Sequence, residues 1–383
     1  MRIGFCILLL LEFFCSCNGG VCLPESKYGE TMNCNIKQVK FTVPDDMLEL
    51  NTYSTTFAWK NDSVTRVLGY NRFSHALDVL DFNKEKVLYS ISLHREGPDG
   101  VPGRICGIFS FSEDSIWVYD EIGMYLLDGN GHVKHKLHLP ERENVEIRAN
   151  YAMNTSRFIY NKEHRSLLYL AYRKNLWVIE EYQIDVDRVI KTYPLQYSLC
   201  NSKNHKFYGN MKAPNVTFAS KSVVFNYPYE STVYVLDTLT SQIKMFGGNS
   251  HNTMNIAKEC ASVADYSEWE RHFIVNPHFY EVSYLSDLNL FVRLHLGESD
   301  YDSSKSMPDM ILEKTLYVML FDEKFNVVGE IELPHFRYSY FTGWCSLSDA
   351  LLLFVDESSP DRMDNEELLL DLLLPYKSQK KKF

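Results

Sequence analysis

The chain has 383 residues, enough for one large domain or two domains of ordinary size. Hydrophobic residues make up 45%, charged residues 23% and aromatic residues 14%, which is the composition of a folded globular protein rather than a disordered chain. The formal net charge of -11 argues against a generic nucleic-acid-binding surface, so we expect no nucleic-acid partner.

The first 16 residues have the pattern of an export signal. The apolar run 3–11 is too short to cross a bilayer, because a membrane-spanning helix needs about 20 apolar residues. Residues 14–16, Phe-Cys-Ser, precede Cys17 as in the short box that ends a bacterial lipoprotein signal. The sequence therefore predicts a signal peptide over residues 1–16 and Cys17 as the first mature residue. Glu12 inside the apolar stretch leaves a buried N-terminal strand or helix as the alternative.

Six cysteines follow Cys17, namely Cys22, Cys34, Cys106, Cys200, Cys260 and Cys345. An even number in an exported protein permits disulfides, and Cys22 and Cys34, which flank one short loop, are the best candidate pair. Small buried thiols are the favoured alternative. The chain contains no CxxC pair, so zinc ribbons and thioredoxin-like chemistry have no support, and we expect neither a metal nor a cofactor.

Residues 17–36 are polar and contain glycine and proline, as in a tether between a lipid and a folded domain. From residue 37 onward, short strands with alternating hydrophobicity follow one another. Five hairpins recur in which a strand ends in aspartate before a polar turn and a second strand. These hairpins are residues 76–93, 124–140, 176–195, 232–246 and 316–334, with aspartates Asp81, Asp128, Asp185, Asp237 and Asp322.

The hairpins follow a regular spacing. Successive aspartates are 47, 57, 52 and 85 residues apart, and a period near 50 with about four strands indicates a β-propeller blade. A last partial unit at 342–357, followed by the leucine-rich segment 366–375, lacks an outer strand that the isolated strand 37–43 can supply. The sequence therefore predicts an all-β fold, a six-bladed β-propeller of four-stranded antiparallel blades over residues 37–375. A basic tail follows at 376–383.

The longest interval between hairpins carries an insertion. Apolar residues at helical spacing predict a helix within residues 253–273. The residues on this stripe are Ile256, Cys260, Val263 and Ala264. The polar segment 299–309 is interpreted as a loop between two strands.

The lipoprotein box and the repeated strands together resemble an uncharacterised family of exported lipoproteins of the Bacteroidales. In residues 70–101 an Asp-bearing strand pair is followed by Glu-Gly-Pro and Gly-Val, as in those propellers, whose shape is similar to TolB and NHL repeats. The resemblance implies a lipid attached to Cys17 and a place in the bacterial cell envelope at the outer membrane. No acidic residues directly follow Cys17, which favours the periplasmic side over the cell surface. The family has no established activity, so the resemblance supplies no catalytic residue.

One loop is a candidate binding surface. Connections between propeller blades cross one face near the central channel, so the loop between the first hairpin and the next strand can line that face. Its charged residues are Arg95, Glu96, Asp99 and Arg104. The favoured alternative is a turn shaped by Gly97, Pro98 and Gly100.

The sequence contains no GxSxG, HExxH, P-loop or GxGxxG motif. We therefore expect a lipid-anchored binding or scaffold module for a protein or glycan partner, without catalysis. Enzymatic activity stays open, and the alternative is a carbohydrate-active enzyme. Such an enzyme would place two carboxylates about 5 to 10 Å apart in the central channel.

Overall fold

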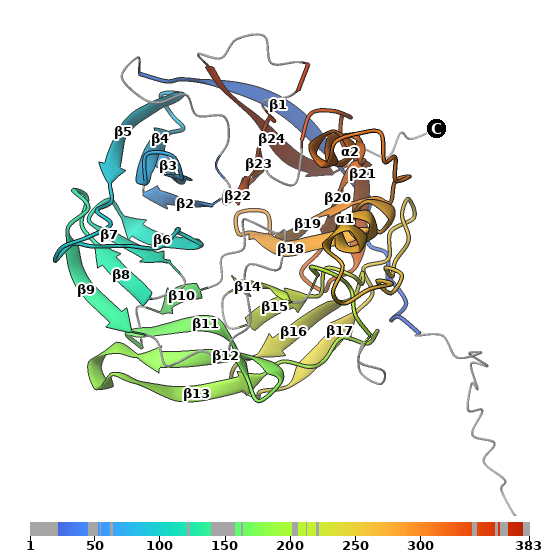
Figure 1. Ribbon diagram of the computed structural model, residues 1–383, viewed down its shortest axis with the longest axis horizontal. Coiled ribbons are helices and arrows are strands. Elements are labelled where there is room, and N and C mark those ends of the chain that lie inside the picture. Colours follow the sequence, from blue (N-terminus) through green and yellow to red (C-terminus); the bar gives the residue numbers. More distant parts are fainter. Residues whose placement is uncertain are drawn as a thin grey trace, which may run out of the picture.

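The computed structural model describes residues 22–44, 53, 55–61, 64–120, 123–138, 158–161, 164–200, 206–211, 213–219, 222–338, 343–356, 359–360 and 367–377. These residues form mostly β-strands, gathered in antiparallel sheets that stand around a central axis (Figure 1). The expected all-β fold is confirmed.

Four sheets have four strands each, in chain order across the sheet. The first contains β6 (Gly107–Ser112), β7 (Ser115–Tyr119), β8 (Gly123–Leu127) and β9 (Val133–His138). The second contains β10 (Phe158–Asn161), β11 (Ser166–Arg173), β12 (Leu176–Gln183) and β13 (Arg188–Pro194). The third contains β14 (Asn215–Ala219), β15 (Ser222–Asn226), β16 (Val233–Asp237) and β17 (Ile243–Phe246). The fourth contains β18 (His278–Leu285), β19 (Leu290–Leu296), β20 (Leu316–Phe321) and β21 (Val327–Glu332).

A fifth sheet has eight strands, in two sets of four. One set is β2 (Thr56–Asn61), β3 (Val64–Asn71), β4 (Ala76–Asp81) and β5 (Lys86–Ser92). The other is β1 (Met32–Thr42), β24 (Glu367–Lys377), β23 (Leu351–Phe354) and β22 (Trp344–Ser346). A single parallel bridge, between Thr42 and Lys86, joins the two sets. The described residues therefore form five hydrogen-bonded sheets, where six separate ones were expected.

The N-terminal strand closes the ring. β1 pairs antiparallel with β24 over its whole length, from Met32 opposite Lys377 to Thr42 opposite Glu367. The expected completion of the last unit by residues 37–43 is thus confirmed, and the strand begins earlier than predicted. The pairing covers the edge of β24, which would otherwise expose unpaired backbone groups.

Residues 17–36 were expected to be a tether outside the folded domain. The part of this segment that the structure describes is instead hydrogen-bonded to the domain. The backbone oxygen of Lys27 accepts a hydrogen bond from the Val327 amide at 2.7 Å, and the Gly29 amide donates to the Val327 oxygen at 3.0 Å. The hydroxyl of Ser26 accepts from the Asn249 amide at 2.8 Å. This polar segment therefore runs along β21 and supplies partners for its edge, before continuing into β1.

The repeated aspartates explain why the hairpins form. In four of the five, one carboxylate oxygen accepts hydrogen bonds from two backbone amides of the turn that follows. For Asp81 the donors are Asn83 and Lys84, at 2.9 and 3.1 Å. Asp128, Asp237 and Asp322 make the same kind of contact. Asp185 differs, because it lies in a short 3-10 turn and pairs with Arg165 at 3.0 Å.

The two helices do not follow the sequence expectation. A helix was predicted within residues 253–273, but α1 spans Tyr266–Val275 and overlaps only the last part of that range. Ser262 and Asp265 are the reason: the Ser262 hydroxyl accepts from the Asp265 amide at 3.1 Å, and Asp265 then caps the helix by accepting from Ser267 at 3.0 Å. The predicted apolar stripe therefore precedes the helix.

The expected loop 299–309 also contains the start of a helix, α2 (Met307–Glu313). The Ser306 side chain accepts from the Asp309 amide at 3.3 Å, and Pro308 occupies the first turn, where its missing amide hydrogen costs nothing. Both helices lie beside the β18–β21 sheet (Figure 1). In the described part of the chain, neither is long and apolar enough to cross a membrane.

Candidate functional site

A cavity of about 190 Å³ lies on the central axis, which we call the channel cavity. It is bounded by the innermost strands β2, β6, β10, β14, β18 and β22, which surround the axis in Figure 1. The lining residues are Thr56, Phe57, Ala58, Phe109, Ile159, Thr217, Phe218, Glu281, Ser283, Tyr284, Trp344, Cys345 and Ser346. Every inner strand therefore contributes at least one side chain.

Aromatic rings dominate the channel cavity, and one carboxylate lies among them. The rings of Phe57 and Phe109 are 5.1 Å apart. Glu281 is only 5% exposed, and the Trp344 indole donates a hydrogen bond of 2.5 Å to its Oε1. Burial, with a contribution from the nearby Glu281, raises the pKa of Cys345 to about 12, so this thiol stays protonated at neutral pH. Among the described lining residues, Glu281 is the only one that is an Asp, Glu, Lys, Arg or His.

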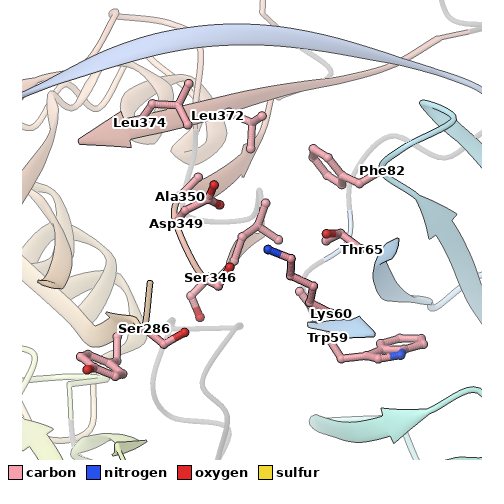
Figure 2. A pocket seen from close by; sticks show the side chains of 14 residues that line it. Trp59, Lys60, Thr65, Phe82, Ser286, Ser346, Asp349, Ala350, Leu372 and Leu374 are labelled. Carbon is pink, nitrogen blue, oxygen red and sulfur yellow. The ribbon is translucent and has the colours of Figure 1, made fainter. Parts of the chain in front are cut away.

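A second cavity of about 460 Å³, the mouth cavity, opens at one end of the axis. It shares Ala58, Tyr284 and Ser346 with the channel cavity, so the two adjoin. Its other lining residues are Trp59, Lys60, Thr65, Phe82, Ser286, Leu347, Ser348, Asp349, Ala350, Leu372 and Leu374 (Figure 2). Most belong to β2, to β24, or to the turns that follow β18 and β22.

On the polar side of the mouth cavity, an ion pair and hydrogen bonds connect residues of two sheets. Lys60 Nζ lies 3.6 Å from Asp287 Oδ2, and both side chains are about half exposed. The Ser348 hydroxyl donates to the same Asp287 oxygen at 2.7 Å, and the Asp287 amide donates to the Ser348 backbone oxygen at 2.8 Å. Figure 2 shows the Lys60 side chain extending into the cavity, with Asp349 on the β22–β23 side.

The opposite side of the mouth cavity is apolar. Phe82, Leu372 and Leu374 form this wall (Figure 2). They come from the first and last sets of strands, so the cavity lies where these two sets adjoin. An apolar wall facing a few polar groups is the usual makeup of a small-ligand site.

The loop predicted to line a binding face contacts the start of β9. None of Arg95, Glu96, Asp99 and Arg104 lines either of the two cavities. Asp99 accepts a hydrogen bond from the Val133 amide at 2.9 Å and lies 3.2 Å from the His132 ring, so the loop is fixed to the beginning of β9. The Arg95 guanidinium donates to the Pro102 backbone oxygen at 3.2 Å. The proposed lipid attachment residue Cys17 is outside the described residues.

The cysteines of the described part are all free thiols, so the candidate Cys22–Cys34 disulfide is absent from the structure. Cys200, Cys260 and Cys345 are buried, as the alternative interpretation expected. No group of three or more His, Cys, Asp or Glu side chains in the described residues is placed to hold a metal ion.

The paired carboxylates expected of a carbohydrate-active enzyme find no support in the described lining. The channel cavity has Glu281 alone, and the mouth cavity has Asp349 alone. Sequence reasoning missed Glu281, Lys60 and Trp344. Glu281 gave a usable signal, because it is a lone acid in the otherwise uncharged strand β18.

A family model described as "Domain of unknown function (DUF4221)" matches residues 31–332. The chain belongs to this family. A DUF4221 member of known crystal structure, from Bacteroides vulgatus, aligns with a TM-score of 0.72 at 13% identity, over 91% of this chain and 99% of that one. The expected relationship to an uncharacterised Bacteroidales family is confirmed.

Two further solved structures align less closely with this DUF4221 chain. A Bacteroides fragilis protein described as exported has a TM-score of 0.55 at 11% identity, over 92% of this chain and 98% of that one. A WD40 domain from Toxoplasma gondii coronin has a TM-score of 0.40 at 7% identity, covering 94% and 90%. No curated protein matches the chain. The sheets arranged around one axis in this chain make its fold all-β and propeller-like.

Proposed function

We propose that this DUF4221 protein is a lipid-anchored, six-bladed propeller of the bacterial cell envelope. In this proposal the domain binds a protein or glycan partner at the mouth cavity and performs no catalysis. The count of six follows if the two four-stranded sets of the largest sheet are taken as separate blades. The single parallel bridge between those sets supports this division, because antiparallel neighbours within each set pair along most of their length.

The proposed location in the cell envelope is supported by the sequence and by one relative. The lipoprotein box precedes Cys17, and the Bacteroides fragilis structure is that of a protein described as exported. Pro24, whose backbone oxygen accepts from the Asn249 side chain at 3.3 Å, is seven residues beyond Cys17. Seven residues reach about 25 Å at most, so the proposed anchor holds the domain close to its membrane, at the outer membrane on the periplasmic side.

A palmitate analogue tests the anchor. Cells that produce the full-length chain should incorporate the label, and Cys17→Ala should abolish it, because Cys17 is the residue that carries the proposed lipid. The Cys22→Ala variant is the matched control and should keep the label. Label retained by Cys17→Ala would refute the assigned residue.

The observation that carries the binding role is the mouth cavity itself. Its volume of about 460 Å³ falls in the range of ligand sites, and an apolar wall faces the exposed Lys60 and Asp349 side chains. The single carboxylate in each cavity gives no general acid and nucleophile pair, which favours binding over hydrolysis.

Affinity measurements with matched variants test this role. The full-length protein in detergent is screened against a glycan array and a peptide library, and each hit is titrated. Lys60→Ala with Asp349→Ala should weaken a true hit by about tenfold or more, because both charges face the ligand. The exposed pair Arg165 and Asp185 offers a control, since their double alanine variant removes the same charges from the turns before β11 and after β12, in another sheet. Equal losses in both variants, or turnover of a bound glycan, would overturn the proposal.

A further inference from the structure

The channel cavity differs in chemistry from the mouth cavity. The mouth cavity has polar groups of both signs, with Lys60 beside Asp287 and with Asp349 nearby. The channel cavity has a buried acid, Glu281, among apolar and hydroxyl-bearing side chains. No lysine, arginine or histidine is among its described lining residues. Any charge that the described lining carries is therefore negative.

Aromatic residues surround that acid from five inner strands. Phe57, Phe109, Phe218, Tyr284 and Trp344 belong to β2, β6, β14, β18 and β22, respectively. The faces of aromatic rings carry partial negative charge, so they attract cations within about 6 Å of the ring centre. A cavity that combines several rings with one carboxylate is thus complementary to positive charge.

The rings and the acid are fixed in place before any ligand arrives. The Trp344 ring packs on Tyr280 at 4.7 Å between centroids and donates to Glu281. Tyr284 packs on Phe291 at 4.8 Å, and Phe57 packs on Phe109. The Thr56 hydroxyl donates to the Trp344 backbone oxygen at 2.8 Å, which joins the inner strands β2 and β22. Little conformational freedom is lost on binding to such a site.

We propose that the channel cavity binds a small organic cation, whose ammonium or guanidinium group contacts Glu281 and the surrounding rings. A metal ion is the less suitable cation, because hard metals require several oxygen ligands and the rings supply none. The cavity of about 190 Å³ suits a compact head group, and the adjoining mouth cavity provides its route of access. This site goes beyond the proposed partner binding and does not depend on it.

Isothermal titration with a pair of isosteric probes tests the inference on the full-length protein in detergent. Choline carries a quaternary ammonium group, and 3,3-dimethyl-1-butanol has the same shape without the charge. We expect choline to bind at least about tenfold more tightly than its neutral isostere, as aromatic cages discriminate by charge. Equal binding of the two probes would overturn the proposal.

Variants of two carboxylates locate the site. Glu281→Gln keeps an oxygen that can accept from Trp344 but removes the charge, so choline affinity should fall by about tenfold or more. Asp349→Asn removes the mouth carboxylate and should change choline affinity by less than about threefold. A thermal melt of each variant confirms that it is folded. Unchanged choline binding in Glu281→Gln would contradict the proposal.

Two more probes distinguish a free amine from a lysine side chain of a partner protein as the cation that binds. Butylamine represents a free amine, and a pentapeptide with a central lysine represents a side chain of a partner; binding of either one supports the site. Failure of choline, butylamine and the lysyl peptide at about 10 mM, where even millimolar affinities register, would overturn it. Lys60→Ala with Asp349→Ala separates the two proposals, because that variant should lose partner binding at the mouth and retain cation binding in the channel.

Discussion

At the scale of single residues, three buried carboxylates recur at equivalent places in the fold. Asp78, Glu180 and Asp371 lie in β4, β12 and β24, the third strand of their sets, and a tyrosine hydroxyl donates to each. Glu180 and Asp371 also pair with arginines through two hydrogen bonds each. Each ion pair thus replaces part of the hydration that burial removes.

Asp371 shows why the leucine-rich strand β24 tolerates a charge. Its carboxylate accepts from Arg337 Nη2 at 2.9 Å and from the Tyr338 hydroxyl at 2.5 Å. Asp371→Leu should lower the free energy of unfolding by about 3 to 5 kcal/mol, because the buried Arg337 guanidinium loses its counter-ion. Urea denaturation measures the loss. Asp371→Leu with Arg337→Met should recover most of it, and a double variant no more stable than the single one would contradict this account.

The cysteines give a second test at this scale. Burial raises the pKa of Cys34 and of Cys345 to about 12, so both thiols are protonated and unreactive near pH 8. Cys22 is exposed. We expect iodoacetamide to modify Cys22 in the folded protein and Cys345 only after unfolding, as mapped by peptide mass spectrometry. Rapid labelling of Cys345 in the native protein would contradict the described packing.

At the scale of elements, the hairpins were predictable and the helices were not. Four of the five hairpins carry their own signal, since an aspartate at the strand end accepts hydrogen bonds from amides only two to four residues away. The apolar spacing that predicted a helix is a weaker signal than these turns. Hydrogen bonds of Ser262 and Asp265 set the backbone direction just before α1, so the helix begins later than that spacing indicates. Local hydrogen bonds of this kind override apolar spacing.

The location of the candidate site could not be predicted, for a different reason, although Glu281 stands out in its strand. Alternation along a strand assigns Glu281 to one of two faces, but it cannot tell which face meets the axis. The channel cavity forms only when inner strands far apart in the chain converge, as β2 and β22 do. Lys60 and Asp287 meet in the same way, from two different sheets.

Lys314 connects the two helical insertions with the fourth sheet. It is 2% exposed, and its ammonium group donates to the backbone oxygens of Phe273, Ile274 and Asn276 at 2.7, 2.8 and 2.8 Å. These oxygens lie at the end of α1, where helix carbonyls lack partners. Lys314→Met keeps the aliphatic volume and should cost about 2 kcal/mol or more, because buried oxygens lose their donor.

Hydrogen exchange measures this effect locally. Amides of residues 266–276 should exchange faster in Lys314→Met, whereas those of β11 and β12 should not change. Lys305→Met is the matched control, because Lys305 makes an exposed pair with Glu313 at 2.7 Å, and it should leave exchange unaltered. Equal protection of α1 in both variants would show that Lys314 does not hold the helix end.

At the scale of the whole molecule, β1 determines whether the ring closes. It supplies the outer strand of the last set and contacts the first set through Thr42. Its side chains Val39 and Phe41 pack in one cluster with residues of both sets, including Leu80 and Leu370. The residues that join the ends of the ring are therefore separated by most of the chain. Contacts between residues so far apart in the sequence are slow to form during folding.

Phe41→Ala tests this closure. Phe41 is fully buried and its ring packs edge-on against Phe82 at 5.2 Å, so the cavity left by alanine should cost about 3 to 5 kcal/mol. Because the cluster belongs to two sets, hydrogen exchange should rise in β4 and β5 as well as in β23 and β24. Phe158→Ala, an equally buried phenylalanine in β10, should instead loosen the β6–β9 and β10–β13 sheets. If exchange in Phe41→Ala rose in β1 alone, the strand would be an attached edge, and the ring would stay closed without it.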